Sequence, residues 1–570
     1  MGRKKRAAAP RRGSEAIFYR AFAREITRSR QLSAVACGGG KRIFGGGDSG
    51  YIANMAIQKT TPPPAYALTI DRKPMTLAQV DALYGRPLRV ELSSGVLQQI
   101  HESRAKIDRH LASGKAIYGV NTGFGKLCNK RISDADLAQL QENLILSHAV
   151  GTGPAVPPEV VRLMMLFKIN ALAAGASGVQ PACVHWLVDM VNADLLPIVP
   201  ARGSLGASGD LAPLAHMVLP MIGRGEVWDG EKRVPAGAAM KSRGIEPVRL
   251  GPKDGLALIN GTQLMLAYGA ALCVRGWRLA RHADVIVTLS LEALQGSLKP
   301  FSAELMALRP HRGAVEVADN VRRLMAGSEI LVAHANCDKV QDPYSLRCAP
   351  QVHGACRDAL RHATQTVLTE AHAVTDNPIL VGEEVISGGL FHGEPLALAL
   401  DYLAMALTEW ANISERRTYL LLSGHDGLPT LLMQNTGLNS GFMIPQYTAA
   451  ALVNECKVLS TPASVDSIPT SLGQEDHVSM GATSAIKGWQ VLENAETVLA
   501  IELMCAAQAL DYRLPTKPGI GPRAALEALR RRIPHAEADR MFGEDIRTAL
   551  ALVRDQEILR QVESQAGALA

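Results

Sequence analysis

Hydrophobic residues recur at helical spacing through most of the chain after residue 65. The stretch 92–107 opens with serines and continues with periodic apolar residues, which predicts a capped amphipathic helix. The stretch 158–175 begins with proline and ends with glycine, as helices often do. Two further stretches, 395–424 and 484–513, are thirty residues long and apolar on most faces. The pattern therefore predicts a mainly α protein.

The two thirty-residue stretches decide the architecture. A helix that is apolar nearly all round must be buried among other helices. At helical rise each would be about 45 Å long, which predicts a long-helix bundle, completed by other subunits. Four charged residues argue against membrane insertion of the second stretch, and no apolar run of eighteen residues is free of charge. The charged residues are Lys487, Glu493, Glu496 and Glu502.

Charge and composition divide the chain unevenly. Residues 1–50 hold twelve Lys or Arg and three acidic residues, a net charge of +9. Because the whole chain carries +6, the remainder carries −3 and is not expected to bind nucleic acid. We expect a basic, disordered extension over 1–60. An N-terminal domain over 61–260, a central helix-bundle domain over 261–515 and a helical tail over 516–570 would come after it.

The basic extension has three possible interpretations. Arg-Lys-Lys-Arg, two triple-glycine runs and Thr-Thr-Pro-Pro-Pro indicate disorder. The segment could be an Arg-rich targeting sequence, a basic interaction arm, or a translated leader upstream of a true start at Met55. It lacks the apolar core of a secretory signal. The leader or simple disorder is the favoured interpretation.

The nine cysteines indicate a reducing compartment. Their number is odd, their spacing is scattered, and no C-x-x-C pair occurs. We therefore expect free thiols in a cytoplasmic protein. No H-E-x-x-H motif is present, so the sequence predicts no zinc-protease chemistry and no metal site.

The stretch Gly203-Ser-Leu-Gly-Ala-Ser-Gly-Asp210 carries the most unusual chemistry. Its three glycines allow backbone conformations that a Cβ would forbid, and Asp210 is the expected N-cap of the apolar helix behind it. In a tight loop the amide nitrogen of Gly209 can approach the carbonyl carbon of Ala207. Cyclisation and loss of two waters would convert Ser208 into a methylidene on an imidazolone ring, a strong electrophile.

Other motifs surround this stretch in the sequence. The glycine-rich segment 117–126 matches neither phosphate-binding pattern, and with Tyr118 it is expected to form a mobile lid. Ser147-His148 lies within the segment 143–151, and Gln474-Glu475-Asp476-His477 lies within 464–480. Tyr344 and Arg347 lie three residues apart within 341–354. Smaller motifs occupy 255–263, 375–378, 386–395 and 437–443.

Together these segments resemble the aromatic amino acid ammonia-lyases, in order and in spacing, over roughly residues 65 to 515. In that family Ala207-Ser208-Gly209 would form the cofactor 4-methylidene-imidazol-5-one (MIO), and no dissociable cofactor is needed. The fold implied is a mainly α long-helix bundle of the fumarase/aspartase-like type. Leu390 and Gly393 depart from the family's usual Asn and Ala, which affects only the fine shape of the pocket.

The resemblance also implies roles for individual residues. Tyr344 would be the general base, Tyr118 a second acid or base, and Arg347 the holder of the substrate carboxylate. The remaining roles are binding roles. Asn260 and Gln341 would hold the MIO oxygen or the amino group, His148 and Glu475 would bind an imidazole, and Phe391 would pack near the MIO. The implied assembly is a homotetramer whose active sites combine three subunits.

Glu475 carries the substrate preference. Members of the family that act on histidine have Gln-Glu-Asp-His here, and a phenyl ring would leave this carboxylate without a partner. The expected reaction is elimination of ammonia from L-histidine to give trans-urocanate. Attack on the MIO by the amino group or by the ring remains open. A tyrosine-specific lyase or aminomutase, which also carries Ser-His, and a non-catalytic helical oligomer are the alternatives.

Overall fold

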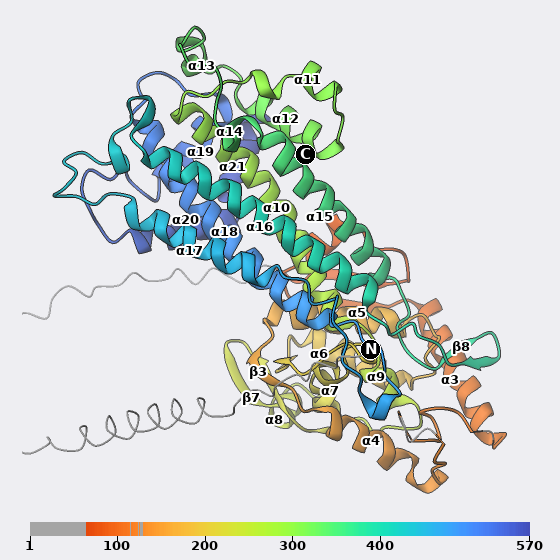
Figure 1. Cartoon of the computed structure of the whole chain (residues 1–570). Helices are drawn as coiled ribbons and strands as arrows, with labels where there is room; N and C mark the ends of the chain where they lie inside the picture. Colours follow the sequence, from red (N-terminus) through yellow and green to blue (C-terminus); the bar gives the residue numbers. More distant parts are fainter. Residues whose placement is uncertain (1–63, 115, 124, 126–128) are drawn as a thin grey trace, which may run out of the picture. The chain divides into compact units, whose positions relative to one another are not determined.

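The computed structural model describes residues 64–114, 116–123, 125 and 129–570, and the contacts among them form one compact unit (Figure 1). The basic segment 1–60 lies outside the described residues. The domain boundaries expected at 260 and 515 stay predictions. No helix of the described part combines the length and apolarity that a bilayer span requires.

Short helices and small sheets make up the part that precedes the bundle. β1 and β2 pair in parallel, β3 pairs with β5, and β4, β6 and β7 form an antiparallel sheet. The strands are β1 (Tyr66–Ile70), β2 (Leu88–Leu92), β3 (Thr152–Ala155), β4 (Leu196–Pro197), β5 (Pro200–Arg202), β6 (Glu226–Asp229) and β7 (Lys232–Pro235). The helices are α2 (Leu77–Leu83), α3 (Ser94–Ala112), α4 (Leu137–His148), α5 (Pro158–Leu172), α6 (Pro181–Asn192), α7 (Leu211–Val218), α8 (Ala236–Ser242) and α9 (Asp254–Ile259).

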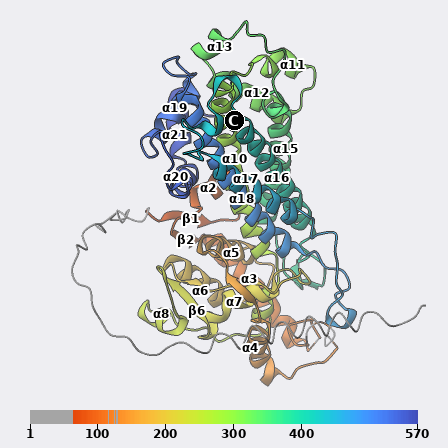
Figure 2. The same ribbon diagram turned by 60° about the vertical axis from the view of Figure 1, so that its left-hand side comes forward.

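Five long helices form the core of the bundle. α18 packs along both α10 and α16, and α15 packs along α16 (Figures 1 and 2). Their bounds are α10 (Gln263–Ala293), α15 (Ala349–Ala371), α16 (Glu394–Leu422), α17 (Met443–Leu459) and α18 (Gly481–Asp511). The helices predicted over 395–424 and 484–513 are confirmed as α16 and α18, and the predicted fold class is confirmed.

Fully buried ion pairs fix the axial register of the long helices relative to one another. Arg417 of α16 donates to Glu502 of α18, with Nη2 2.8 Å from Oε2, and both side chains are inaccessible to solvent. Arg357 of α15 donates to Asp284 of α10 at 2.6 Å, again without exposure. Since an unpaired buried charge is strongly destabilising, a register shift that separated either pair would be costly.

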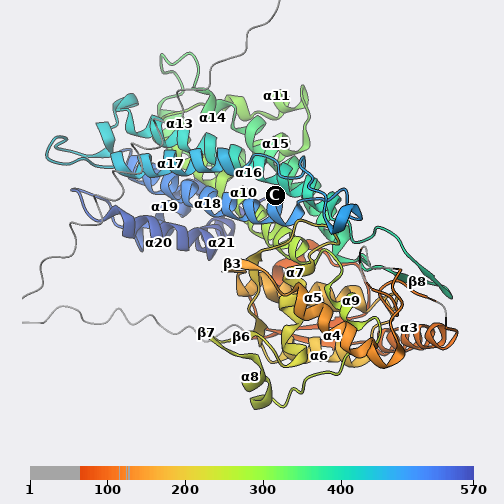
Figure 3. The same ribbon diagram turned by 60° about the horizontal axis from the view of Figure 1, so that its bottom comes forward.

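Shorter elements surround the long helices; α12 packs on α15 and α20 packs on α18 (Figures 2 and 3). One group comes after α10 and consists of α11 (Ala303–Ala307), α12 (Arg312–Leu324), α13 (Glu329–Ala333) and α14 (Tyr344–Arg347). The hairpin of β8 (Ile379–Val381) and β9 (Glu384–Ile386) precedes α16. The predicted C-terminal tail contains α19 (Ile520–Arg530), α20 (Phe542–Arg554) and α21 (Glu557–Ala566).

Candidate active site

Glycines shape the loop at 203–210. Gly206 has φ of +81° and Gly209 has φ of +73°, a region that side chains strongly disfavour. A Cβ on Gly209 would overlap the backbone carbonyl of Gly261, and one on Gly206 would overlap the hydroxyl of Ser479. Both positions therefore need glycine for conformation and for space.

The carboxylate of Asp210 ties this loop to the first turn of α10. Its Oδ2 accepts hydrogen bonds from the backbone N–H groups of Leu264 at 2.9 Å and Met265 at 3.1 Å. The prediction that Asp210 caps the following helix, α7, is correct in position but wrong in partner, because its side chain makes no capping bond there. The N-terminus of the much longer α10 lies within reach and presents free N–H groups to the carboxylate.

A buried lysine supports the segment beside the loop. Lys168 of α5 donates from Nζ to the carbonyl oxygens of Asn260 at 2.7 Å and Ala257 at 3.2 Å. Burial lowers the pKa of Lys168 to about 7 and raises the pKa of Asp210 to about 7, because each charge loses its hydration. Their mutual attraction offsets part of this cost. Lys168 holds the segment 257–260, and Asp210, of opposite charge, holds the loop 203–210.

A cavity of about 560 Å³ opens beside Ser208. This volume is typical of a site for a small molecule. Its wall combines the segment after α3, the end of α4, the loop 203–210, the end of α9 and the loop before α18. Five of the residues expected from the sequence meet in this wall: Tyr118, His148, Ser208, Asn260 and Glu475.

His148 ends α4 with its imidazole oriented by its own helix. Nδ1 lies 2.8 Å from the carbonyl oxygen of Leu144, so Nδ1 carries the proton and donates it. Nε2 is then the acceptor nitrogen of the ring. Burial lowers the pKa of His148, partly opposed by this hydrogen bond and by Glu475, so the imidazole is neutral near pH 7. A neutral ring of this tautomer can accept a hydrogen bond from a ligand in the cavity.

Glu475 faces Ser208 across the cavity. Its Oε1 accepts from the Ser208 hydroxyl at 3.4 Å, and its Oε2 accepts from the Thr470 hydroxyl at 2.9 Å. The backbones of Thr470 and Glu475 also bond to each other, at 2.9 Å and 3.3 Å. The carboxylate is therefore held in one orientation, with one oxygen directed at the loop.

Asn260 and Tyr118 offer polar atoms to the same cavity. Asn260 is buried, and its Oδ1 has no hydrogen-bond partner among the described residues. Because a buried amide oxygen without a donor is costly, this atom is suited to a ligand that donates a hydrogen bond. The Tyr118 hydroxyl accepts from the Gly125 N–H at 3.1 Å. Residues 124 and 126–128 of this segment, which includes the expected lid, lie outside the described residues.

Phe391 is half-buried and does not line this cavity. It lies two residues before Gly393, where a Cβ would press on Met265 and Ser479. Ser479 also contacts Gly206 of the loop. The segment of Phe391 therefore adjoins the loop 203–210 through Ser479.

The other expected residues lie at the far end of α10. Asp342 fixes their position, because its Oδ2 accepts from the backbone N–H of Ser297 at 2.6 Å, just beyond the end of α10. Asp210 caps the opposite end of that helix. A helix of 31 residues is about 45 Å long. Within one chain, Ser208 is therefore a helix length away from Gln341, Tyr344 and Arg347. Figures 1 and 3 show α7, which follows Ser208, and α14, which contains Tyr344 and Arg347, in opposite parts of the chain.

Tyr344 is exposed and Arg347 is half-buried at that far end, and the two form a pair. The Arg347 guanidinium stacks over the Tyr344 ring at 4.5 Å from its centre, and its Nε donates to the Asp342 carbonyl at 2.9 Å. The Tyr344 side chain is 71% exposed. The pair is thus pre-arranged, with the Tyr344 ring largely open to solvent.

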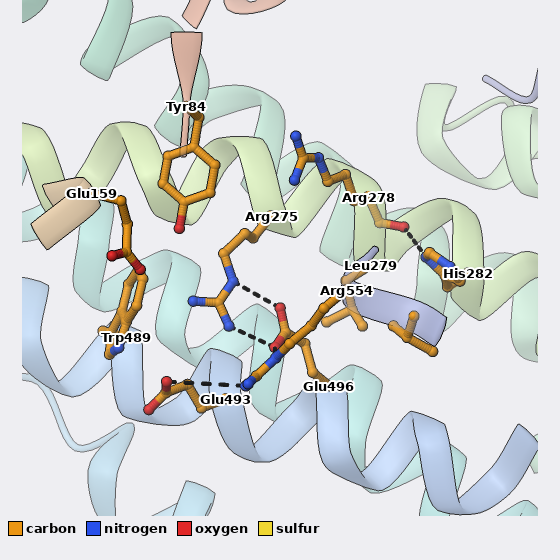
Figure 4. A pocket seen from close by; sticks show the side chains of 11 residues that line it. Tyr84, Glu159, Arg275, Arg278, Leu279, His282, Trp489, Glu493, Glu496 and Arg554 are labelled. Atoms are coloured by element: carbon orange, nitrogen blue, oxygen red, sulfur yellow. Dashed lines mark hydrogen bonds and ion pairs between the residues drawn. The ribbon is translucent and has the colours of Figure 1, made fainter. Parts of the chain in front are cut away.

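A second, smaller cavity of about 220 Å³ lies between α10, α18 and α20 (Figure 4). Arg275 binds Glu496 through two hydrogen bonds, at 2.9 Å and 2.6 Å, and stacks over Trp489 at 4.4 Å. Arg554 donates to the same carboxylate at 2.7 Å. Arg275, Glu496 and Arg554 pair with one another and join three helices, so this group of charges has a structural role. It contains none of the residues predicted to act in a site.

Two residues of the candidate site were not predicted. Lys168 interrupts the apolar run 163–172, and a lone charge in an otherwise apolar helix signals a buried, bonded role. Thr470 carries no such signal, because its role depends on a bridge to Glu475 that only the folded loop creates.

Known proteins match both the chain and its fold. Residues 75–531 match the family model described as aromatic amino acid lyase. The chain therefore belongs to the aromatic amino acid lyase family. The relatives and solved structures that it resembles define its place within that family more closely.

Curated relatives of this chain from several bacteria are named histidine ammonia-lyase. The protein of Myxococcus xanthus (strain DK1622) is 48% identical over 500 residues, which cover 87% of this chain and 98% of the relative. That of Gloeobacter violaceus (strain ATCC 29082 / PCC 7421) is 50% identical over 484 residues, covering 84% and 94%.

Solved structures of two activities share the fold. Histidine ammonia-lyase from Trypanosoma cruzi has a TM-score of 0.81 at 38% identity, covering 88% of this chain and 95% of that one. Tyrosine aminomutase from Streptomyces globisporus has a TM-score of 0.84 at 34% identity, covering 88% and 100%. Because the fold is common to both activities, the choice of substrate depends on the residues of the cavity.

Proposed function

We propose that this chain is a histidine ammonia-lyase, which eliminates ammonia from L-histidine to give trans-urocanate. The observation that carries the proposal is the position of Glu475, 3.4 Å from Ser208 and in one cavity with His148. A substrate imidazole has one N–H donor and one acceptor nitrogen when neutral. Glu475 accepts from the donor, and the Ser147 hydroxyl of the same cavity donates to the acceptor nitrogen, because the free Nε2 of His148 is itself an acceptor.

The electrophile of the reaction would be the MIO group formed from Ala207, Ser208 and Gly209. The chain's residues fit such a group, because Gly209 sits where a Cβ would strike Gly261, and the Oδ1 atom of Asn260 is buried and unpartnered among the described residues. When formed, the group supplies an electron-poor methylidene carbon that makes the substrate easier to deaminate.

The chain's own residues supply binding and proton transfer. In the overall reaction the Cα–N bond breaks, a proton leaves Cβ, and a C=C bond forms between them. Tyr344 would take the Cβ proton, and Arg347 would hold the α-carboxylate through two parallel hydrogen bonds. The guanidinium stacks over the Tyr344 ring, so the two side chains are held together before substrate binds. Tyr118 and Gln341 would complete the polar contacts of the substrate.

We further propose a homotetramer in which one chain completes the cavity of another. The separation of Ser208 from Tyr344 by the length of α10 supports this, because one chain cannot bring them together. α16 also exposes a single narrow stripe on an otherwise buried helix. The stripe has the three- and four-residue spacing of helix-packing seams and consists of Leu398, Tyr402, Met405, Glu409, Asn412, Arg416 and Tyr419.

Light scattering tests the assembly. The protein should have four times the chain mass, and Tyr402→Asp should lower that mass because a charge would enter the seam. Met541→Asp is the matched control, since Met541 is an exposed apolar residue away from the stripe. A wild-type monomer that retains full activity would contradict the assembly proposal.

A cytoplasmic location is proposed on the state of the cysteines. The described cysteines are all free thiols, and Cys183, Cys273, Cys356, Cys456 and Cys505 are buried. Reduced thiols of this kind are typical of the cytoplasm. Fractionation of cells that express the full chain would test the location.

A tyrosine-specific lyase or aminomutase is the alternative, supported by the likeness to tyrosine aminomutase. The deciding experiment offers L-histidine, L-tyrosine and L-phenylalanine separately to the purified protein. Ultraviolet absorbance and ammonia release identify the product. We expect trans-urocanate from histidine and much slower use of the others, with Ser208→Ala as the inactive control. Preference for tyrosine would overturn the histidine assignment and leave the family intact.

A further inference from the structure

Two histidines and a glutamate from distant segments converge beside the loop 203–210. His392 and Glu394 lie at the start of α16, and His477 lies in the segment before α18. Ligand atoms of the three side chains all lie within 4.8 Å of one another. The two imidazole rings are 5.6 Å apart between centres and tilted by 32°.

The three groups do not satisfy one another. Glu394 Oε2 is buried without a hydrogen-bond partner, and no ion pair joins Glu394 to a histidine among the described residues. The His392 nitrogens make only long contacts of 3.4 Å, to the N–H of Glu394 and the carbonyl of His477. A buried carboxylate oxygen and two weakly engaged imidazoles therefore lie close together. Such unsatisfied groups call for a ligand.

We propose that His392, Glu394 and His477 bind one divalent cation of the zinc class per chain. Two imidazoles and one carboxylate are the ligands that Zn²⁺ and its transition-metal neighbours prefer, whereas Ca²⁺ and Mg²⁺ need more oxygen ligands. Ligand bonds of about 2.0–2.1 Å around one tetrahedral ion bring the ligand atoms to about 3.3 Å apart. Side-chain rotation provides this approach, because His477 is exposed.

The bound cation would tie together two segments of the candidate site. His392 directly follows Phe391, and His477 lies two residues after Glu475. Gly393 already packs against Ser479 between the two segments. The metal is thus a positioning group that restrains the Glu475 loop, and it takes no part in bond breaking. The site rests on these side chains alone and does not depend on the identity of the substrate.

Titration with Zn²⁺ tests the site directly. Full-length protein without an affinity tag is freed of metal with a chelator and titrated in a calorimeter. We expect one strong site per chain, weakened at least tenfold in His477→Ala and in Glu394→Gln. His101→Ala is the matched control, because His101 is an exposed histidine of α3 that is not part of the cluster, and it should bind as wild type does. Equal binding by all four proteins would overturn the proposal.

Two further measurements test whether zinc binds at another residue and whether the bound ion is tetrahedral. Cys337 is an exposed thiol that could bind zinc, so the titration is repeated in Cys337→Ser, which should keep the site. Co²⁺ added to the wild type should produce the visible absorption of a tetrahedral nitrogen–oxygen site, a result that requires no folded variant. Loss of binding in Cys337→Ser, or a Co²⁺ spectrum identical to that of the ion in water, would contradict the site.

Discussion

The hydroxyl of Ser208 donates to Oε1 of Glu475 at 3.4 Å, although 267 residues separate them in the chain. The glycine-rich loop and the acidic loop are thus two walls of one cavity. The group proposed to choose the substrate therefore lies directly beside the group proposed to react with it. A change at Glu475 is expected to act on substrate choice and leave the chemistry of the loop intact.

Replacement of Glu475 by glutamine should lower kcat/KM for histidine at least about tenfold, because a charge-assisted hydrogen bond contributes about 1.5–3 kcal/mol. Glu475→Ala should lose more, since the imidazole would then lack a partner. Steady-state kinetics measure both, and peptide mass spectrometry checks that the Ser208 segment is processed as in wild type. Full histidine turnover by Glu475→Ala would contradict the assignment.

Gly209→Ala should abolish activity, because the new methyl group would meet the carbonyl of Gly261. Gly230→Ala is the matched control. Gly230 has a similar φ of +63°, but nothing lies within 4 Å of a Cβ placed there. The wild-type peptide around Ser208 should be lighter by two water molecules, and the Gly209→Ala peptide should not. Equal activity of the two variants would refute the role assigned to the loop's packing.

Asp210→Asn should weaken the start of α10. The substitution removes the charge that attracts the N–H groups of Leu264 and Met265, at a cost of about 0.5–2 kcal/mol, typical of lost caps. Urea denaturation monitored by circular dichroism measures the loss. Asp358→Asn serves as a comparison, because its carboxylate accepts a single backbone bond, from Gly313 at 3.1 Å. A smaller loss for Asp210→Asn than for Asp358→Asn would count against the cap.

Mixed assembly should restore activity that two inactive variants lack separately. Ser208→Ala and Tyr344→Phe are damaged at opposite ends of α10, so a mixed oligomer contains cavities with both residues intact. Random pairing of two chains would repair about a quarter of the sites. Co-expression and a subsequent activity assay measure this. Ser208→Ala mixed with Gly209→Ala should remain inactive, because both variants are damaged at the same end of α10. Equal activity of the two mixtures would contradict active sites shared between chains.

His282 should make the fold sensitive to acid. Burial lowers the pKa of His282 to about 4, against about 6.5 in the unfolded chain, with the nearby Arg278 and Arg281 acting in the same direction. The contribution of neutral His282 to the free energy of unfolding is fully present above pH 6.5. It is lost as the pH falls towards 4, by about 3 kcal/mol in all. Denaturation of wild type and His282→Gln at several pH values measures it. A pH slope identical in the two proteins would refute the prediction.

The sequence pattern located two of the five long helices of the bundle, and its misses have a physical cause. α16 and α18 are visible in the sequence because they are apolar on nearly every face. α10 is just as buried but carries Arg275, Asp284 and Glu292 among other charges, which look like a solvent-facing pattern. Their partners on other helices, such as Glu496 for Arg275, exist only in the folded chain.

The candidate site was predictable in its local motifs and unpredictable in its layout. Ser208 and His148 each sit in a short motif whose residues stay together after folding. The position of Tyr344 relative to Ser208 depends on the length of α10, and a local sequence motif contains no information about that length. The partner of the Asp210 carboxylate also depends on which helix start lies nearby in space.

The length of α10 has a consequence for how this sequence can change over generations. A single residue inserted into a helix shifts all later residues of that helix by about 1.5 Å and turns them by about 100°. In α10 that step would displace Asp342 and Tyr344 relative to the loop that Asp210 anchors, and it would break the pairing of Asp284 with Arg357. Gene variants that add or delete residues are therefore expected to accumulate in connecting segments, such as 423–442, while the residue count of α10 is inherited unaltered.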